Sequence, residues 1–576
     1  MARNMDLHRS NVAGLRERPE AQVLVIGGGI NGLGTFRDLA LQGIDVALVE
    51  RSDYASGASS ASSHMIHGGV RYLENGEFRL VREAVHERNG LLKIAPHYVK
   101  PLRTTIPIFR TFSGIVAAPL RFVTHKQRST VERGALLIKL GLTIYDSFSR
   151  DGGTIPRHVF RRSKAALRDL PRLNPAVKYA ATYYDASVHE PERLALDVLR
   201  DARAAAGPAR AANYVAAVGV ADGRVRLRDE ITGEEFAFHA DLIINASGPW
   251  TDLTNGALGR TTRLMGGTKG SHIVLDSPEL LAACAGRELF FENSDGRIVL
   301  IYPLRGKVMV GTTDLEADIA GPIRCTDAEV RYFFDLIAHV FPDVRVDESQ
   351  IVYRFAGVRP LPAHGDTQPG FVSRDYRIDT DRPANLPGTT VLSLVGGKWT
   401  TFRAVAERLT DTALSLLGEP RRVSTNGLPI GGGRDYPADG EARRRWIAEH
   451  RDGLSPERAE QLLRRYGTNA EEVIGFLAEH GDDPLAATTE FTVQELEHMV
   501  LHEDVVHVHD VLMRRTSSAF DGAVTSAVIE ETAAHLQTLL GWSGGRLADE
   551  VAETTRILAD EHGVRLERPA APVGGR

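Results

Sequence analysis

Two histidines, an arginine and a tyrosine are gathered in one short segment, Ala55 to Leu73, whose other residues are mostly small. Its first half is rich in serine, alanine and glycine, a composition that by itself fits a flexible linker. Its second half holds His64, His67, Arg71 and Tyr72, more functional side chains than a linker needs. Imidazoles exchange protons near neutral pH, and guanidinium groups bind anions. The segment therefore predicts a reactive site.

Two more arginines stand at the ends of predicted strands. Arg359 follows Val358, and Arg374 follows Ser373. A single arginine in such a place is usually a solvated rim residue. Together with Arg71, however, these two predict a site for a phosphate or a carboxylate, because the planar guanidinium fork matches the geometry of those anions.

A glycine-rich turn near the N-terminus has the spacing of a dinucleotide-binding unit. It joins a predicted strand, a helix and a second strand, which we place at Gln22 to Ile26, Leu33 to Gln42 and Asp45 to Val49. Gly27 permits the tight turn, Gly29 lets backbone N–H groups approach a pyrophosphate, and Gly32 lets the helix pack closely on the strand. Glu50 ends the second strand, where its carboxylate can accept ribose hydroxyl protons and disfavours a 2′-phosphate. The unit therefore predicts either NAD or FAD.

Two later turns favour a flavin over NAD. A buried strand predicted from Leu242 ends at Asn245-Ala246-Ser247-Gly248-Pro249, which would set a second glycine turn beside the cofactor. Another predicted strand, Val391 to Val395, is followed by Gly396-Gly397-Lys398-Trp399-Thr400-Thr401 and a helix. The backbone N–H groups of this turn, with Lys398 nearby, could stabilise negative charge on a reduced flavin ring.

The alternation of strands and helices predicts an α/β fold, with a Rossmann-type FAD-binding domain interleaved with a β-rich substrate domain and an all-helical C-terminal domain. The expected boundaries are 20–100, 180–260 and 355–417 for the first domain, 101–179 and 261–354 for the second, and 430–545 for the third. Residues 1–19 and 565–576 are expected to be disordered. In the helical domain, Thr492-Val493-Gln494-Glu495 has the spacing of a capping box.

The segment from Ile106 to Tyr145 allows two interpretations. It mixes apolar with cationic residues, a pattern typical of helices that lie in a membrane interface. The same pattern fits an ordinary pair of helices that face the core. No apolar run in the sequence approaches the roughly 18 residues that a membrane span requires. The segment therefore predicts at most a peripheral membrane contact.

Composition and charge exclude several classes of protein. The 576 residues carry a formal net charge of −6, which argues against bulk binding to nucleic acid. Two cysteines, Cys284 and Cys325, predict free thiols in a reducing compartment. The first residues lack the apolar stretch of a secretory signal. We expect a cytoplasmic protein, peripheral at most on the inner face of the cell membrane, and the sequence leaves a homodimer open.

Four histidines in the helical domain, His498, His502, His507 and His509, invite a metal interpretation. The first two share a helix face, but the residues between them lack the glutamate of a zincin motif. The last two point in different directions on a helix. We therefore expect structural histidines and no metal site.

Seven stretches of the sequence carry a family resemblance. They are Val25 to Gly32 (VIGGGING), Ser59 to Glu74 (SSASSHMIHGGVRYLE), Asn245 to Trp250 (NASGPW), Lys269 to Val274 (KGSHIV), Gly311 to Asp314 (GTTD), Gly357 to Leu361 (GVRPL) and Gly396 to Thr401 (GGKWTT). Together they resemble the FAD-dependent, membrane-associated glycerol-3-phosphate dehydrogenases of the aerobic type, a branch of the D-amino-acid-oxidase-like flavoproteins. They run in the family's order, and the helical tail resembles the family's C-terminal domain.

The resemblance implies hydride transfer from C2 of sn-glycerol 3-phosphate to N5 of FAD, which gives dihydroxyacetone phosphate, with electrons then passed to a membrane quinone. It also implies that His67 is the base for the C2 hydroxyl proton, since an imidazole suits that task. Arg359 is the second expected catalytic residue. The expected substrate contacts are Arg71, Tyr72, Arg359 and Arg374. The expected FAD contacts are Gly27, Gly29, Asn31, Gly32, Glu50, Ser62, Ser63, His67, Gly248, Gly397, Lys398 and Thr400.

The chain departs from the family pattern at two places. His64-Met65 stands where the family usually has Lys-Leu, which puts a second imidazole near the site and leaves its role open. Trp399-Thr400-Thr401-Phe402 stands where the family has Leu-Thr-Thr-Tyr, and this change predicts altered packing only.

Two other functions stay open at this point. A glycerol-3-phosphate oxidase would use the same site and deliver electrons to oxygen, although the internal insertion that some of these oxidases carry is not seen here. A non-catalytic, FAD-bound sensor could use the same fold, because fold does not fix function.

Overall fold

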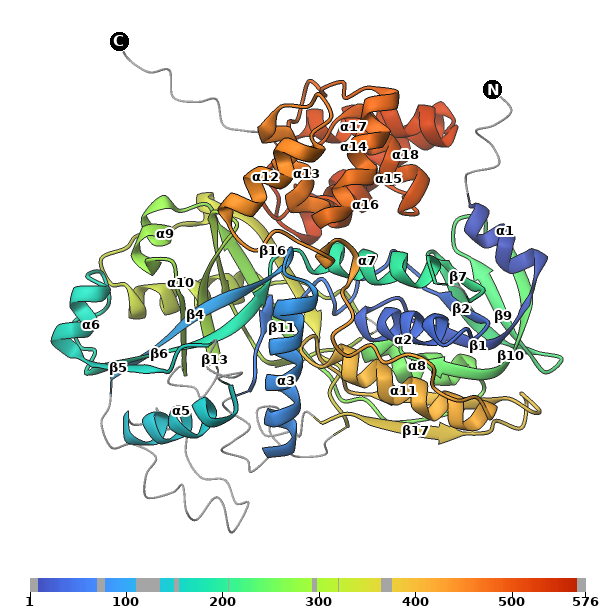
Figure 1. Ribbon diagram of the computed structural model, residues 1–576, viewed down its shortest axis with the longest axis horizontal. Coiled ribbons are helices and arrows are strands. Elements are labelled where there is room, and N and C mark those ends of the chain that lie inside the picture. The colour runs from blue at the N-terminus through green and yellow to red at the C-terminus, as the bar shows by residue number, and fades with distance from the viewer. Residues whose placement is uncertain are drawn as a thin grey trace.

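Two sheets and a bundle of helices make up the α/β fold expected from the sequence (Figure 1). The computed structural model describes residues 9–69, 78–109, 135–149, 155–205, 207–292, 298–319, 321–363 and 375–566. Arg71, Tyr72 and Arg374 lie outside the described residues.

The first sheet is built around the parallel strands that flank the glycine turn. Its order is β17-β18-β10-β1-β2-β7, with the hairpin of β8 and β9 attached to β10. Because β1, β2, β7, β10 and β18 run parallel, their carboxyl ends meet at one edge, where open α/β sheets bind ligands. The strands are β1 (Glu20–Ile26), β2 (Val46–Val49), β7 (Ala209–Ala212), β8 (Val215–Ala221), β9 (Arg224–Asp229), β10 (Glu235–Asn245), β17 (Arg377–Asp381) and β18 (Thr390–Val395).

Three helices supply much of the core against this first sheet. They are α2 (Ile30–Leu41), α7 (Pro191–Arg203) and α11 (Phe402–Leu417), and α2 contacts both of the others. Their apolar residues share one cluster with those of β1, β2, β10 and β18. The central strands therefore read as continuous apolar runs, as expected for parallel strands that are covered on both faces.

The second sheet is mostly antiparallel and has the order β15-β11-β14-β13-β12-β4-β6-β3, with β16 on β11 and β5 on β6. Its strands are β3 (Met65–Ile66), β4 (Val99–Ile108), β5 (Val159–Arg162), β6 (Tyr179–Val188), β11 (Thr268–Leu275), β12 (Glu288–Glu292), β13 (Ile298–Leu304), β14 (Lys307–Gly311), β15 (Leu315–Glu316) and β16 (Ile351–Val358). The accompanying helices are α3 (Phe78–Ile94), α5 (Ala135–Ser149), α6 (Ser163–Asp169), α9 (Pro278–Cys284) and α10 (Asp327–Val340), whereas α8 (Thr251–Ala257) contacts β8, β10 and β18 of the first sheet.

Two strands belong to a different sheet from the one that the expected boundaries imply. β6 pairs with β4, and β16 pairs with β11, so both lie in the second sheet. The boundaries 180–260 and 355–417 had assigned most of β6 and the end of β16 to the FAD-binding domain. The reason is physical: an apolar strand pattern shows that a strand is buried and says nothing about its partner.

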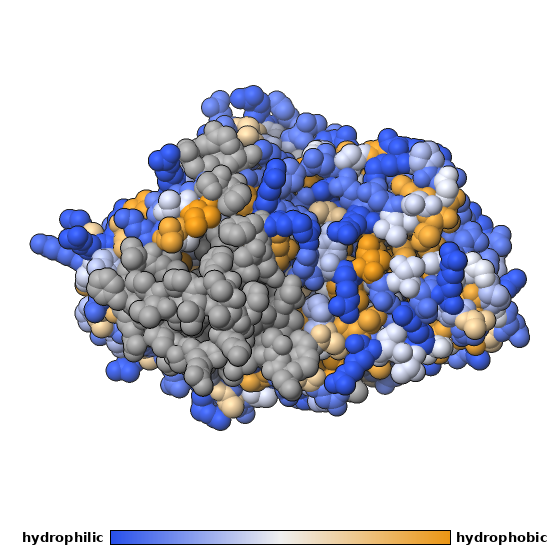
Figure 2. Space-filling view, turned by 90° about the horizontal axis from the view of Figure 1, so that it is seen from below, coloured by the Kyte–Doolittle hydropathy of each residue, from blue (hydrophilic) through white to orange (hydrophobic). Residues whose placement is uncertain are grey.

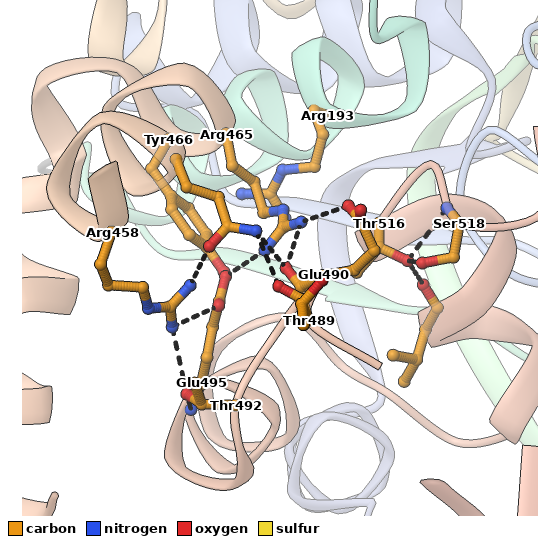
Figure 3. A network of polar contacts seen from close by, with 12 residues as sticks. Arg193, Arg458, Arg465, Tyr466, Thr489, Glu490, Thr492, Glu495, Thr516 and Ser518 are labelled. Atoms are coloured by element: carbon orange, nitrogen blue, oxygen red, sulfur yellow. Dashed lines mark hydrogen bonds and ion pairs between the residues drawn. The ribbon is translucent and has the colours of Figure 1, made fainter. Parts of the chain in front are cut away.

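A helical domain covers one side of both sheets (Figure 1). Its helices are α12 (Gly440–His450), α13 (Pro456–Tyr466), α14 (Ala470–His480), α15 (Val493–His502), α16 (Val508–Asp510), the π-helical turn η8 (Val511–Arg515), α17 (Ser526–Leu540) and α18 (Gly544–Arg556). The expected capping box is only half formed. Thr492 Oγ1 accepts from the N–H of Glu495, but the Glu495 carboxylate accepts from Arg458, Arg465 and Tyr466 instead (Figure 3). Buried arginines compete for that carboxylate more strongly than a backbone N–H does.

The N-terminal segment is more ordered than expected. A short helix, α1 (Ser10–Glu17), buries Val12 and Leu15, and Arg9 pairs with Asp229 at 2.8 Å. Two apolar residues are too few to predict a helix, because a short helix takes its stability from tertiary packing.

Helix α5 lies at the C-terminal end of the segment for which a membrane contact was one interpretation. Leu142 and Tyr145 are buried against α3, which favours the core-facing interpretation for this part, whereas Leu140 is 58% exposed. Residues 110–134 lie outside the described part. On the face seen from below, the coloured surface shows hydrophobic residues scattered among hydrophilic ones (Figure 2). None of the helices that the structure describes has the length and apolar character needed to cross a membrane.

Candidate active site

The glycine turn after β1 is held tightly against the end of β10. Gly27 has a φ of +114°, and a Cβ there would lie 2.7 Å from the carbonyl oxygen of Ala246. A Cβ at Gly32 would lie 1.9 Å from the carbonyl oxygen of Gly27. Both glycines are therefore required by close backbone packing. The N-cap residue of α2 is Gly29, which has no side chain to cap the helix. N–H groups that the N-cap residue leaves free at a helix start are suited to bind a pyrophosphate.

Glu50 lies beside this turn. Its Oε2 accepts from the N–H of Gly28 at 2.6 Å, and its Oε1 accepts from the N–H of Ser52 at 3.0 Å. Burial raises the pKa of Glu50, while the two backbone N–H donors act in the opposite direction. The carboxylate is thus fixed at the edge of the glycine turn, in the place expected for a ribose ligand.

The small residues of the segment from Ala55 pack against three other parts of the chain. Ser59 Oγ accepts from the N–H of Ile30 at 3.0 Å, and the Ser59 carbonyl accepts from Trp399 Nε1 at 2.9 Å. A Cβ at Gly357 would lie 2.5 Å from the Cβ of Ala61. The small side chains therefore permit close packing, and this part of the segment is no linker. Trp399 does more than alter packing, because its indole N–H bonds this segment.

His67 is positioned through its backbone and its neighbour. Its N–H donates to Thr400 Oγ1 at 3.2 Å, and the next N–H, that of Gly68, donates to Asp185 Oδ1 at 3.1 Å. Asp185 is buried with Arg88, whose Nη1 lies 2.9 Å from Oδ1. The half-buried His67 side chain thus stands on a segment that is fixed from two sides.

The second imidazole of the segment, His64, belongs to the contact with the helical domain. Its Nδ1 lies 3.0 Å from the carbonyl oxygen of Val188, and its ring centroid lies 5.3 Å from that of Phe520. Burial lowers the pKa of His64 to about 3, so the ring is neutral at physiological pH. These contacts give His64 a structural role.

His272 on β11 was not singled out in the sequence. Its Nε2 lies 2.8 Å from Ser63 Oγ, and its ring stacks on Phe355 with centroids 4.8 Å apart. Burial first, and then the charge of Arg359, hold the pKa of His272 well below its usual range. A neutral imidazole therefore stands between Ser63 and Arg359. The stretch KGSHIV contained the signal, since His272 is an ionisable residue at a buried position of its strand.

The guanidinium group of Arg359 is oriented by the turn that follows β14. Nη1 donates to Asp314 Oδ1 at 3.0 Å, and Nη2 donates to Thr312 Oγ1 at 2.9 Å. A Cβ at Gly270 would lie 2.2 Å from Nη2, so the guanidinium group lies directly over β11. The structure thus brings Arg359 close to His272. The predicted partners Arg71 and Arg374, like Tyr72, fall outside the described residues.

The last two predicted turns lie at the same edge of the first sheet. Gly397 has a φ of +108°, and a Cβ there would lie 2.8 Å from Asn31 Nδ2, so this turn rests on the start of α2. Gly248, with a φ of +61°, follows the end of β10. Lys398 lies close enough to Glu83 that its charge opposes the rise in the pKa of that carboxyl caused by burial.

The predicted FAD contacts fit a bound dinucleotide in one further respect. Asn31 Oδ1 is buried and has no hydrogen-bond partner among the described residues, although Asn31 stands in the first turn of α2. A buried acceptor without a donor is unfavourable, and a bound cofactor could supply the donor. Ser62, the neighbour of Ser63, accepts at its Oγ from the N–H of His64 at 3.2 Å.

The helical-domain histidines make structural contacts. Burial lowers the pKa of His498 to about 4, and its ring lies edge-on to Tyr466 and Phe476. His507 Nδ1 lies 2.8 Å from Glu550 Oε1. Across the ranges that the structure describes, no group of three or more histidine, cysteine or acidic residues is arranged to hold a metal ion.

Two family models match the chain. One, described as "FAD dependent oxidoreductase", matches residues 22–411, and the other, described as "C-terminal domain of alpha-glycerophosphate oxidase", matches residues 423–547. The protein is therefore an FAD-dependent oxidoreductase, and its cofactor is FAD.

Similar individual proteins indicate which family of FAD-dependent oxidoreductases the chain belongs to. The chain is 33% identical over 541 residues to "Glycerol-3-phosphate dehydrogenase" of Synechocystis sp., with 88% of this chain and 91% of that protein covered. It is 31% identical over 516 residues to "D-erythritol 1-phosphate dehydrogenase" of Brucella abortus, with 87% and 95% covered. It belongs to the family of FAD-dependent glycerol-3-phosphate dehydrogenases, which confirms the resemblance seen in the seven stretches.

A solved structure supports the same fold. The glycerol-3-phosphate dehydrogenase from Bacillus halodurans, determined in complex with FAD, superposes with a TM-score of 0.72 at 23% sequence identity. The match covers 96% of each chain, so it includes the helical domain.

Proposed function

We propose that this enzyme oxidises sn-glycerol 3-phosphate to dihydroxyacetone phosphate and passes the electrons to a membrane quinone. The observation that carries the proposal is the placement of Arg359 beside the neutral imidazole of His272, in a chain that matches nearly the whole length of a relative named glycerol-3-phosphate dehydrogenase. A fixed guanidinium group suits a phosphate monoester, and a neutral imidazole suits proton transfer.

The residues of the chain have separate roles in this proposal. Gly27, Gly29 and Gly32 admit the pyrophosphate at the start of α2, and Glu50 accepts ribose hydroxyl protons. Bound FAD supplies the hydride acceptor. Arg359 binds the substrate phosphate, together with Arg71 and Arg374 of the sequence prediction, while Tyr72 lines the pocket. His67 removes the proton of the C2 hydroxyl, and Lys398 stabilises negative charge near the turn that carries it.

Replacing His67 with asparagine should slow anaerobic reduction of the flavin by glycerol 3-phosphate about a hundredfold or more, because general-base catalysis is worth that much. Binding of the substrate phosphate should change little, since Arg359 is retained. Stopped-flow absorbance, measured over a range of substrate concentrations, gives the limiting rate and the apparent dissociation constant separately.

His272 is the competing base, and the same experiment with His272→Asn distinguishes the two. If the flavin of His67→Asn is reduced at the native rate while that of His272→Asn is not, the base assignment moves to His272. His86→Asn is the matched control, because His86 is exposed on α3 and the flavin of this variant should be reduced at the native rate.

A second polyol phosphate is an alternative candidate for the substrate. One relative of similar identity is named for D-erythritol 1-phosphate, a longer polyol phosphate. Anaerobic titration of the holoenzyme with each compound tests both, because only a substrate bleaches the flavin absorbance. We expect glycerol 3-phosphate to have the higher kcat/KM. Bleaching by neither compound would favour the non-catalytic sensor.

The electron acceptor separates a dehydrogenase from an oxidase. We expect rapid turnover with a soluble quinone analogue under anaerobic conditions and slow peroxide formation in air. Fast peroxide formation without quinone turnover would contradict the dehydrogenase assignment.

Peripheral attachment at the cytoplasmic side of the membrane is part of the same proposal, and α5 provides a test. Leu140→Glu should weaken binding to phospholipid vesicles roughly tenfold, because burial of one leucine contributes about 1.5–3 kcal/mol. Leu140 is 58% exposed, and the control Leu416→Glu changes a 43% exposed leucine on α11. Vesicle co-sedimentation measures both. Equal binding of the two variants and the native protein would rule out α5 as the contact.

A further inference from the structure

The loop that carries Glu50 is bound by side chains of the C-terminal helical domain. Asp53, three residues after Glu50, is 1% exposed. Its Oδ2 accepts from Arg514 Nε and from Arg515 Nη1, the latter at 2.6 Å, and its Oδ1 accepts from Arg515 Nη2 at 2.9 Å. Asn213 Nδ2 donates to the same Oδ1 at 2.9 Å. Both arginines belong to η8, more than 450 residues along the chain.

The next residue of the loop is held by the same domain. Tyr54 is buried, and its hydroxyl donates to Asp504 Oδ2 at 3.0 Å. Asp504 is also paired with Arg203 of α7. Its carbonyl oxygen accepts from Asn213 Nδ2 at 2.9 Å, so one amide group bridges the loop and the helical domain.

The opposite side of the loop contacts the nucleotide turn. Glu50 accepts from the N–H of Gly28, and the N–H of Ala55 donates to the carbonyl of Gly28 at 2.9 Å. Glu50 and Ala55 thus both bond the turn, while Asp53 and Tyr54 between them bond the helical domain. In so short a loop, a shift of Asp53 must move Glu50.

Contacts other than those of Asp53 with Arg514 and Arg515 also hold the helical domain against the rest of the protein. Arg193 of α7 donates to both carboxylate oxygens of Glu503, at 2.8 and 2.7 Å, and its guanidinium group lies 4.5 Å from the ring centre of Tyr466. Figure 3 shows Arg193 beside Arg465 and Tyr466 of that domain. At a separate contact, Arg305 donates from Nε and Nη2 to Asp521.

Burial of so many charges needs a reason. The buried cluster holds two guanidinium groups and two carboxylates, because Asp510 Oδ1 accepts from Arg514 Nη2 at 2.6 Å. These groups lose their hydration when they are buried, and their attraction often does no more than offset that loss. Where a buried ionic cluster is retained, it can instead fix one geometry. Here the geometry that it fixes is that of the Glu50 loop.

We propose that the C-terminal domain is part of the FAD site, because Arg514 and Arg515 hold Asp53 and thereby position Glu50 for the ribose of FAD. All three are positioning residues, since they act on the cofactor through Glu50. The proposal rests on FAD binding and does not depend on the identity of the substrate.

The test compares two matched carboxylates at the domain interface. Asp53→Asn should weaken FAD binding about tenfold, a typical size for coupling between two sites. Asp521→Asn, which removes a partner of Arg305 at the other contact, should leave FAD affinity within about twofold. Dilution of each holoenzyme, followed by the fluorescence of released flavin, gives the dissociation constants.

A second variant covers the case in which Asp53→Asn does not fold. Arg515→Lys keeps the charge and loses the paired donors, and it should weaken FAD binding by roughly threefold or more. Native FAD affinity in a folded Asp53→Asn variant would overturn the proposal. If that variant does not fold, native FAD affinity in Arg515→Lys would overturn it in the same way.

Reciprocity provides a readout that a merely structural role would not change. If the cluster couples FAD to the docking of the helical domain, excess FAD must slow hydrogen exchange in residues 508–515 of the native protein. The same addition should have a smaller effect in Arg515→Lys. An FAD effect of equal size in both proteins would contradict the coupling.

Discussion

Replacing Arg359 with leucine is expected to lower kcat/KM for glycerol 3-phosphate about a thousandfold. A phosphate that loses a buried, hydrogen-bonded partner charge loses roughly 2–5 kcal/mol of binding, and each 1.4 kcal/mol corresponds to a factor of ten. Asp314 adds to the effect, because it accepts from Arg359 at 3.0 Å and would repel the substrate phosphate once that guanidinium group is gone. The kcat/KM of Arg359→Lys should lie between those of the native enzyme and Arg359→Leu, since an ammonium group keeps the charge but lacks the paired donors of the guanidinium group.

Strand β16, which Arg359 directly follows, offers a matched control for this experiment. Arg354 is 25% exposed and pairs with Asp327, much as Arg359 is 23% exposed and pairs with Asp314. The partner of Arg354, Asp327, is 75% exposed, whereas Asp314 is 21% exposed. Arg354→Leu should therefore leave kcat/KM within about threefold of the native value, because ion pairs to exposed carboxylates contribute little. Steady-state kinetics with a saturating artificial acceptor measure all three variants. If Arg359→Leu is no worse than Arg354→Leu, the phosphate is bound elsewhere.

The close packing of the glycine turn could be predicted from the sequence because it is fixed by local geometry. Gly27 and Gly32 are required by contacts within one turn and its adjoining strand, so their spacing alone indicates their place. The pairing of β6 and β16 with the second sheet, in contrast, depends on contacts between residues far apart in the chain. Burial makes a strand apolar in either sheet, and this is why the expected domain boundaries missed both strands.

The residues that sequence reasoning missed or left open are defined by tertiary contacts. His272 gains its surroundings from Ser63 and Arg359, each from a separate segment. His64 differs from the family pattern, and its proximity to His67 in the sequence suggested a place in the site. The structure shows instead that it packs against Phe520 of a domain more than 400 residues away. Residue type alone could not show which of these two imidazoles lies near Arg359 and which contacts the helical domain, whereas their neighbours in the structure do.

Replacing Arg88 with methionine is expected to lower the free energy of unfolding by about 3–5 kcal/mol, because it leaves the buried carboxylate of Asp185 without its partner charge. Arg88 is fully buried, and its Nη1 donates to Asp185 Oδ1 and to Tyr145 Oη, at 2.9 Å in each case. Urea unfolding of the FAD-bound protein measures the loss. Tyr145→Phe is the matched control: it removes two hydrogen bonds, one from Arg88 and one to Asp185, and keeps the ion pair, so it should cost only about 2 kcal/mol.

The consequence for catalysis follows from a further donor to the same carboxylate oxygen, which also accepts from Tyr145 Oη at 2.6 Å. Asp185 Oδ1 also accepts from the N–H of Gly68 at 3.1 Å, so a carboxylate that moves toward water carries the backbone beside His67 with it. Arg88→Met should then slow flavin reduction even at temperatures where the protein stays folded. The double variant Arg88→Met with Asp185→Asn removes both charges and should recover most of the lost stability, because a neutral buried pair avoids the uncompensated charge. Its reduction rate should stay low if Asp185 positions His67, and a native rate in this double variant would show that the ion pair stabilises the fold without placing the base.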